Sequence, residues 1–182
     1  PFVITNVESS ELIKYASNAF LATKITFINE VAELCERLGA DVHHVAKGMG
    51  LDRRIGPKFL HPGPGYGGSC FPKDTQALAD IARNAGRPFD IVETVIEVNE
   101  RMKERAVEKV VAALDGEPAG KTVALLGLSF KPETDDMRES VAIPLARTLV
   151  DGGATVRAFD PVAMDNARPL LPDGVHYSSD SY

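Results

Sequence analysis

The sequence predicts an α/β protein in which an all-helical first part precedes one strand–helix–strand unit. Two observations predict this order. Up to about residue 115, apolar residues recur at three- and four-residue steps, the spacing of amphipathic helices. After the glycine-containing linker 116–120, two strand-like runs, 121–130 and 155–161, flank one helical segment. This alternation is typical of a βαβ unit with a parallel sheet.

Four helices are expected in the first part of the chain. Ser9, Ser10 and Glu11 have the composition of a helix start, and Gly39 that of a helix end. The helix between them would have roughly thirty residues and span ~45 Å. Small residues line its first half, so we expect it to pack closely against another helix. The other three helices are expected at 41–47, from Pro72 to Gly86, and at about 89–114.

The second part shows fewer elements. A further helix is expected at 138–153, between the two strand-like runs. No third strand is evident before Tyr182, and a parallel sheet of two strands is not a stable domain by itself. We therefore expect the sheet to be incomplete at the C-terminal end of the chain.

Composition excludes some classes of protein. Hydrophobic residues make up 44% and charged residues 25%, as in soluble globular proteins. The net charge of -6 argues against nucleic acid or an anionic membrane as the main partner. There is no signal-peptide pattern and no apolar run near the ~20 residues of a membrane span. We therefore expect a cytoplasmic protein. We expect no metal site, because the adjacent residues His43 and His44 diverge around a helix.

The stretch HPGPGYGGSCFPKD, residues 61–74, allows two interpretations. Gly63, Gly65 and Gly68 spell G-x-G-x-x-G, which binds dinucleotides when it follows a strand and opens a helix. The preceding PKFLHP makes a poor central strand because of its prolines, so this interpretation is disfavoured. A second pattern, GEPAGKT at 116–122, has too few residues between its glycines for a phosphate-binding loop and reads as a linker.

In the second interpretation the glycines present Cys70 as a nucleophile. Cys70 precedes a predicted helix start, where the helix dipole favours a thiolate, and Lys73 and Asp74 are nearby. A purely structural cysteine remains the alternative. Cys35, the other cysteine, lies on an apolar helix face and is expected to be an inert core residue.

Two polar residues of the long helix are also candidates. Lys14 and Asn18 are four residues apart, so both project from one helical face and could hold one ligand atom. A solvated polar face is the alternative. Asp74 is four residues after Cys70, close enough in a first helical turn to act on the same substrate carbon.

Three long stretches together resemble the UDP-glucose 6-dehydrogenase family. They are ELIKYASNAFLATKITFINE, GLDRRIGPKFLHPGPGYGGSCFPKD and LLGLSFKPETDDMRES, in this order. The resemblance implies an all-α central dimerisation domain, 1–115, followed by a truncated Rossmann-like nucleotide-sugar-binding domain, 119–182. It also implies NAD-dependent four-electron oxidation of UDP-glucose to UDP-glucuronate by a homodimer paired through its long helices.

The resemblance further implies roles for individual residues. Cys70 would form a thiohemiacetal and then a thioester, Lys14 and Asn18 would stabilise the oxyanion, and Asp74 would position or activate the hydrolytic water. Arg138 would reach the NAD pyrophosphate. The nucleotide sugar would contact Arg54 (from the neighbouring subunit), Gly63, Gly65, Tyr66, Gly67, Gly68, Phe130 and Lys131.

One departure from the family pattern limits these implications. Family members begin with a Rossmann domain that has no counterpart here, so we expect the 182-residue chain alone to be inactive. Three alternatives stay open: a related dehydrogenase acting on GDP-mannose or UDP-N-acetylmannosamine, a non-catalytic dimerisation module, and a cysteine hydrolase using His61.

Overall fold

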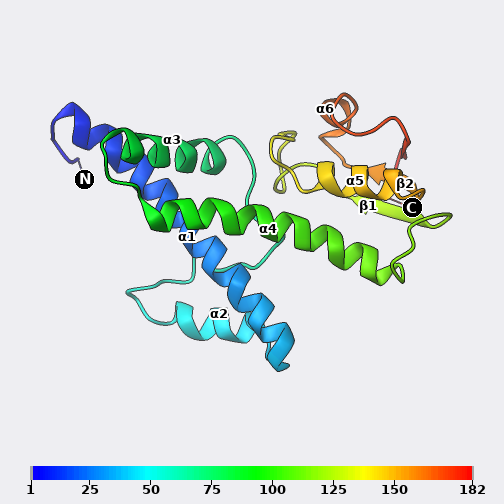
Figure 1. Cartoon of the computed structure of the whole chain (residues 1–182), viewed down its shortest axis with the longest axis horizontal. Coiled ribbons are helices and arrows are strands. Elements are labelled where there is room, and N and C mark those ends of the chain that lie inside the picture. Colours follow the sequence, from blue (N-terminus) through cyan, green and yellow to red (C-terminus); the bar gives the residue numbers. More distant parts are fainter. Residues whose placement is uncertain (1, 182) are drawn as a thin grey trace. The chain divides into compact units, whose positions relative to one another are not determined.

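The computed structural model describes residues 2–181, which divide into two compact units (Figure 1). The first unit contains the chain up to Gly65 and Cys70–Asn99; the second contains Tyr66–Ser69 and the chain from Glu100 onward. The elements are α1 (Val7–Leu38), α2 (Val42–Gly50), α3 (Phe71–Asn84), α4 (Asp90–Ala113), β1 (Thr122–Leu126), α5 (Ala142–Asp151), β2 (Thr155–Phe159), α6 (Met164–Ala167) and β3 (Val175–Tyr177). This order confirms the predicted α/β class.

Helix α1 begins before the predicted serines. Asn6 is its N-cap, because the Asn6 side chain accepts a hydrogen bond of 3.1 Å from the backbone N–H of Ser9. Gly39 ends the helix with a φ of 69° and donates its N–H to the carbonyl of Cys35. Glycine adopts this left-handed conformation without steric cost, so the predicted end is confirmed.

Two other predicted helix starts are shifted. Helix α3 begins at Phe71, which makes Pro72 its second residue. Helix α5 begins at Ala142 and not at Arg138, because Glu139 has a φ of 55° that no α-helix accepts.

Small residues let α1 and α3 pack closely in the first unit. Ala19 of α1 contacts a buried cluster that contains Leu78 and Ala79 of α3 and Val92 of α4. Helix α2 lies along the second half of α1 (Figure 1). Cys35 is buried, as expected of a core residue. The consequence for the site is that the first turn of α3 lies against the first half of α1.

A parallel sheet in the order β1-β2-β3 forms the second unit. Helix α5 lies against β2, and the core between them contains Leu149, Val156 and Ala158 (Figure 1). The sequence did not reveal α6 or β3, because elements of four and three residues are too short to show periodicity. The sheet therefore has one strand more than the two that were evident in the sequence.

Strand β1 is shorter than the predicted run 121–130. The chain leaves the sheet at Gly127, whose φ is 89°, and continues as a loop to Lys131. This loop meets the glycine-rich stretch: Gly68 donates its N–H to the carbonyl of Arg138 at 2.8 Å. A Cβ on Gly68 would lie 2.6 Å from the ring of Phe130. A glycine is therefore required there by both backbone conformation and space.

Replacing Gly68 tests this packing. Gly68 and Gly120 have φ of 81° and 71°, so alanine at either position should cost about 1–2 kcal/mol of backbone strain. Only Gly68→Ala also meets the Phe130 ring, which should cost about 1–3 kcal/mol more. Urea unfolding of both variants measures the difference. Equal losses would show that the Phe130 ring moves aside freely.

Candidate functional site

The carboxylate of Asp74 gathers three side chains in the first unit. Asp74 lies in the first turn of α3, and its side chain is 0% exposed. Its Oδ2 accepts hydrogen bonds of 2.6 Å from Lys14 Nζ and 2.6 Å from Asn18 Nδ2, both on α1. Lys73 Nζ lies 2.9 Å from Oδ1. The four-residue spacing of Lys14 and Asn18 therefore brings both to one oxygen atom.

These partners keep Asp74 ionised. Burial alone would raise the pKa of Asp74, but hydrogen bonds from Lys14, Lys73 and Asn18 outweigh burial and lower the pKa to about 2. In turn, the hydrogen bond to Asp74 and the charge of Asp74 raise the pKa of Lys73. At neutral pH the cluster thus holds an ionised carboxylate bound by Lys14, Asn18 and Lys73.

Cys70 lies at the start of the same helical turn. It is the N-cap of α3, and its carbonyl accepts a hydrogen bond of 2.8 Å from the N–H of Asp74. Its side chain makes no capping hydrogen bond and is exposed. Cys70, Lys14, Asn18 and Asp74, all predicted site residues, are therefore on two packed helices.

Sequence reasoning did not include Lys73 in the predicted site. The sequence places Lys73 near Cys70, whereas the structure pairs Lys73 with Asp74. The signal was present in the sequence, since a lysine directly before an acid in a first helical turn can fold back onto that acid.

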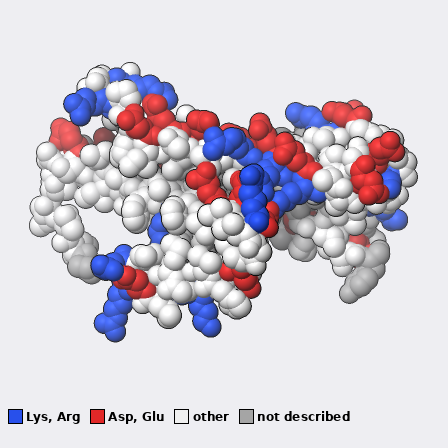
Figure 2. Space-filling view, turned by 60° about the horizontal axis from the view of Figure 1, so that its bottom comes forward, with Lys and Arg blue, Asp and Glu red and all other residues white. Residues whose placement is uncertain are grey.

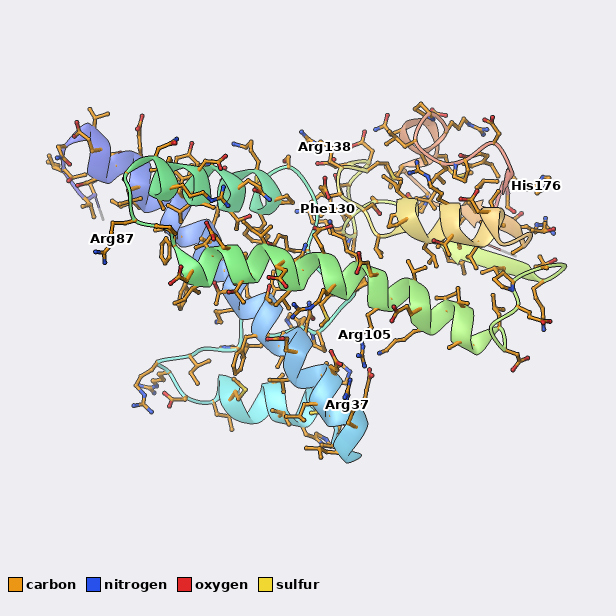
Figure 3. All side chains as sticks on the ribbon, in the orientation of Figure 1. Arg37, Arg87, Arg105, Phe130, Arg138 and His176 are labelled. Atoms are coloured by element: carbon orange, nitrogen blue, oxygen red, sulfur yellow. The ribbon has the colours of Figure 1, made fainter. Side chains whose placement is uncertain are left out.

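A second group of predicted residues lies in the second unit. Phe130 donates its N–H to the carbonyl of Asp136 at 3.0 Å, and Lys131 Nζ lies 5.5 Å from the centre of the Phe130 ring. Figure 3 shows Phe130 and Arg138 on the segment between β1 and α5. Gly67 and Gly68 pack against Phe130 in the same unit.

Arg138 borders a pocket of about 400 Å³ in the second unit. Its guanidinium binds the Asp136 carboxylate through contacts of 2.9 and 2.8 Å, while its side chain stays largely exposed. Hydrogen bonds from Arg138 lower the pKa of Asp136, so this pair is charged at neutral pH. The remaining pocket residues are Asp135, Met137, Asn166, Pro169 and Leu170.

The other predicted substrate-binding residues are distributed over both units of the structure. Gly63 and Gly65 belong to the first unit and Tyr66 to the second. The N–H of Gly63 donates to Oδ1 of the buried Asn29 at 2.8 Å, which fixes the start of the glycine loop. Arg54 binds Asp52 of its own turn, with 3.0 Å between Arg54 Nε and Asp52 Oδ1.

Within residues 2–181, no group of three or more His, Cys, Asp or Glu side chains is arranged to hold a metal ion. None of the described helices combines the length and apolarity needed to cross a membrane. On the face in Figure 2, basic and acidic side chains are intermingled.

Known proteins match both parts of the chain. A family model described as "UDP-glucose/GDP-mannose dehydrogenase family, central domain" matches residues 8–101. A second, for the "UDP binding domain" of the same family, matches residues 124–182. The UDP-glucose 6-dehydrogenase of Rhizobium meliloti (strain 1021) is 56% identical over 182 residues, which are 100% of this chain and 41% of the relative.

Solved structures give the same result. A UDP-glucose dehydrogenase from the hyperthermophilic archaeon Pyrobaculum islandicum has a TM-score of 0.93 and 46% identity, covering 99% of this chain and 41% of that one. An NDP-N-acetyl-D-galactosaminuronic acid dehydrogenase from Methanosarcina mazei Go1 has a TM-score of 0.79 and 29% identity, covering 94% and 38%. The chain spans about two fifths of the length of these relatives.

The charge of Asp74 should appear in the pH dependence of stability. The pKa of about 2 in the folded chain lies below the ordinary aspartate value of 3.8, so ionised Asp74 should contribute about 2 kcal/mol to the free energy of unfolding at pH 7. As pH falls from about 4 to about 2, the unfolded chain takes up this proton first and the contribution is lost.

Asp74→Asn should therefore be less stable than the wild type at pH 7, and the difference should vanish near pH 2. Chemical unfolding at several pH values measures it. Asp80→Asn is the control, because Asp80 lies on the same helix but is 63% exposed. A deficit of Asp74→Asn that persists unchanged at pH 2 would contradict the assigned charge state.

Proposed function

The chain belongs to the UDP-glucose/GDP-mannose dehydrogenase family, and we propose that it supplies the nucleophile and oxyanion-binding groups for NAD-dependent oxidation of UDP-glucose to UDP-glucuronate. The observation that carries this proposal is the buried Asp74 carboxylate, which joins Lys14 and Asn18 one helical turn from Cys70. The greater similarity to named UDP-glucose dehydrogenases than to the N-acetylgalactosaminuronic acid enzyme supports UDP-glucose over other nucleotide sugars.

Cys70 acts as the nucleophile on the C6 aldehyde. Its thiolate forms an S–C bond while the carbonyl π electrons move to oxygen, which gives a thiohemiacetal after protonation. Lys14 and Asn18 each keep N–H groups beyond the one that each gives to Asp74, and these donate to the developing oxyanion. The exposed ammonium of Lys14 is accessible for this contact.

Asp74 acts by positioning and not by accepting a proton. A general base works best when its pKa is near the operating pH, whereas the pKa of Asp74 is lowered to about 2. The carboxylate instead orients Lys14 and Asn18, and through them the hydrolytic water, because Asp74 itself is 0% exposed. Attack of that water on the thioester breaks the S–C bond and releases the Cys70 thiolate. The two protons of the water pass to the solvent, which leaves the carboxylate product.

NAD, when bound, accepts the hydride in both oxidations. Of the residues in this chain, Arg138 fits one of its phosphate groups, because an exposed guanidinium borders a pocket there. Gly63, Gly65 and Gly68 do not form a dinucleotide loop, since no strand precedes Gly63 within residues 2–62.

The second unit contributes to binding of the nucleotide sugar. Lys131 offers an ammonium group to the diphosphate, and Phe130 closes against Gly67 and Gly68. The glycine loop, with Gly63, Gly65 and Tyr66, allows the backbone to approach the ligand. We place the helical domain at 1–115 and the nucleotide-sugar domain at 119–182.

A dimer of two such chains is also proposed, paired through α1. An apolar row runs along this helix at seven-residue intervals and remains exposed: Ile13 51%, Phe20 67%, Phe27 52% and Leu34 54%. A row of this kind fits a second copy of the same helix. Arg54 would then reach the nucleotide sugar of the neighbouring subunit.

The nucleophile can be tested with the two cysteines of the chain. In the complete gene product, Cys70→Ala should lower UDP-glucuronate formation by about a thousandfold or more. Cys35→Ala, which removes the buried thiol, should stay within a few-fold of wild type. Product formation from UDP-glucose, GDP-mannose and UDP-N-acetylmannosamine is measured for each protein. Full activity of Cys70→Ala, or a preference for another sugar nucleotide, would overturn the respective assignment.

The proposed dimer face can be tested by charge insertion. Phe20→Asp combined with Phe27→Asp should convert a dimer into monomers, because each carboxylate would be desolvated in the interface. Ile81→Asp on α3, also an exposed apolar position, should remain dimeric. Sedimentation velocity of the three proteins decides, and a monomeric wild type would refute the proposed dimer.

A further inference from the structure

We propose that Asp160 is a positioning residue for nucleotide-sugar binding, which it serves by fixing the loop Gly127–Lys131. This inference rests on the proposed function, in which Phe130 and Lys131 of this loop contact the nucleotide sugar. Asp160 directly follows β2, whereas the loop directly follows β1, and the two strands are parallel neighbours. Their carboxyl ends therefore meet at one edge of the sheet.

Both carboxylate oxygens of Asp160 are fully used. Oδ2 accepts from the N–H groups of Leu128 at 2.8 Å and Ser129 at 3.3 Å, both in the loop. Oδ1 accepts from the N–H groups of Val162 and Ala163, each at 2.8 Å. Asp160 is only 4% exposed, and these four donors lower its pKa although burial acts in the opposite direction. No neutral side chain of this size accepts four such bonds.

Asp160 occupies the position of an acid that binds a ligand in dinucleotide-binding proteins. In dinucleotide-binding βαβ units, the acid at the end of the second strand binds a ribose hydroxyl. Here the corresponding carboxylate binds backbone N–H groups of its own sheet edge. Asp160 is therefore part of the support for the loop, and the residues that remain available to a ligand are those that the loop carries.

Ser140 binds the carbonyl of the Leu128–Ser129 peptide, whose N–H binds Asp160. Its Oγ donates to the carbonyl of Leu128 at 2.6 Å, and the Leu128 side chain is fully buried. Gly127 donates to the carbonyl of Phe159 at 2.9 Å, and Ser129 Oγ donates to the carbonyl of Lys131 at 2.8 Å. These hydrogen bonds connect Asp160 through Ser129 to the backbone of Lys131. Loss of the Asp160 carboxylate should therefore make Lys131 more mobile, although Asp160 does not contact the Lys131 side chain in this network.

The test compares Asp160→Asn and Ser140→Ala with Asp165→Asn in the complete gene product. Asp165 is the matched control, because it is exposed on the neighbouring α6. Asp160→Asn should raise the KM for UDP-glucose roughly tenfold, equivalent to about 1.4 kcal/mol, with a smaller change in kcat. Ser140→Ala, a milder change, should raise the KM in the same direction, and Asp165→Asn should leave it unchanged.

Two further readouts separate positioning from a loss of folded protein. Adding Lys131→Ala to Asp160→Asn should not raise the KM beyond that of the worse single variant, because both act through one contact. In hydrogen exchange, the amides of Leu128 and Ser129 should exchange faster in Asp160→Asn, while those of Val156 and Ala158 stay protected.

A reduced kcat at unchanged KM, additive effects with Lys131→Ala, or unchanged protection of Leu128 and Ser129 would each overturn the proposal. If the wild-type gene product does not oxidise UDP-glucose, the proposed function fails, and hydrogen exchange still decides whether Asp160 holds the loop.

Discussion

The candidate site depends on one buried charge, the carboxylate of Asp74. An isolated carboxylate in an apolar environment is costly and would take up a proton. Three partners prevent this, two from α1 and one from the adjacent residue of α3. Because α1 and α3 must pack closely for these contacts to form, the small residues at their interface and the charge state of the site are parts of one arrangement.

This arrangement also explains why the reactive groups come from different places. Cys70 is fixed by the start of α3, and Lys14 and Asn18 by the regular spacing of α1. Residues on regular helices are held more precisely than residues on loops, which suits the catalytic roles proposed for these side chains. The glycine-rich stretch does not form a dinucleotide loop, because no strand precedes Gly63 within residues 2–62.

The second unit also contains a buried carboxylate, which is bound by backbone N–H groups and not by cations. Asp160 is buried, and four N–H groups balance its charge at the edge where β1 and β2 end. In both units, therefore, a buried aspartate ties a segment that carries predicted site residues to a rigid element. The carboxylates differ in their surroundings: the partners of Asp74 are themselves ligand-binding candidates, whereas those of Asp160 belong to the sheet edge.

The sequence by itself determined the α/β class and the order of α1 to α5, β1 and β2. It also determined the end of α1 at Gly39 and the place of Cys70 before α3, because periodicity and glycine signals are local. It also placed Lys14 and Asn18 on one helical face. Only the tertiary structure decided that both side chains meet Asp74, that Lys73 joins them, and that Asp160 supports the loop to Lys131. Strand β3 and helix α6 likewise appeared only there. Most of these contacts join residues far apart in the chain, and the pKa of Asp74 depends both on burial and on the hydrogen-bond partners that only the folded chain brings to it.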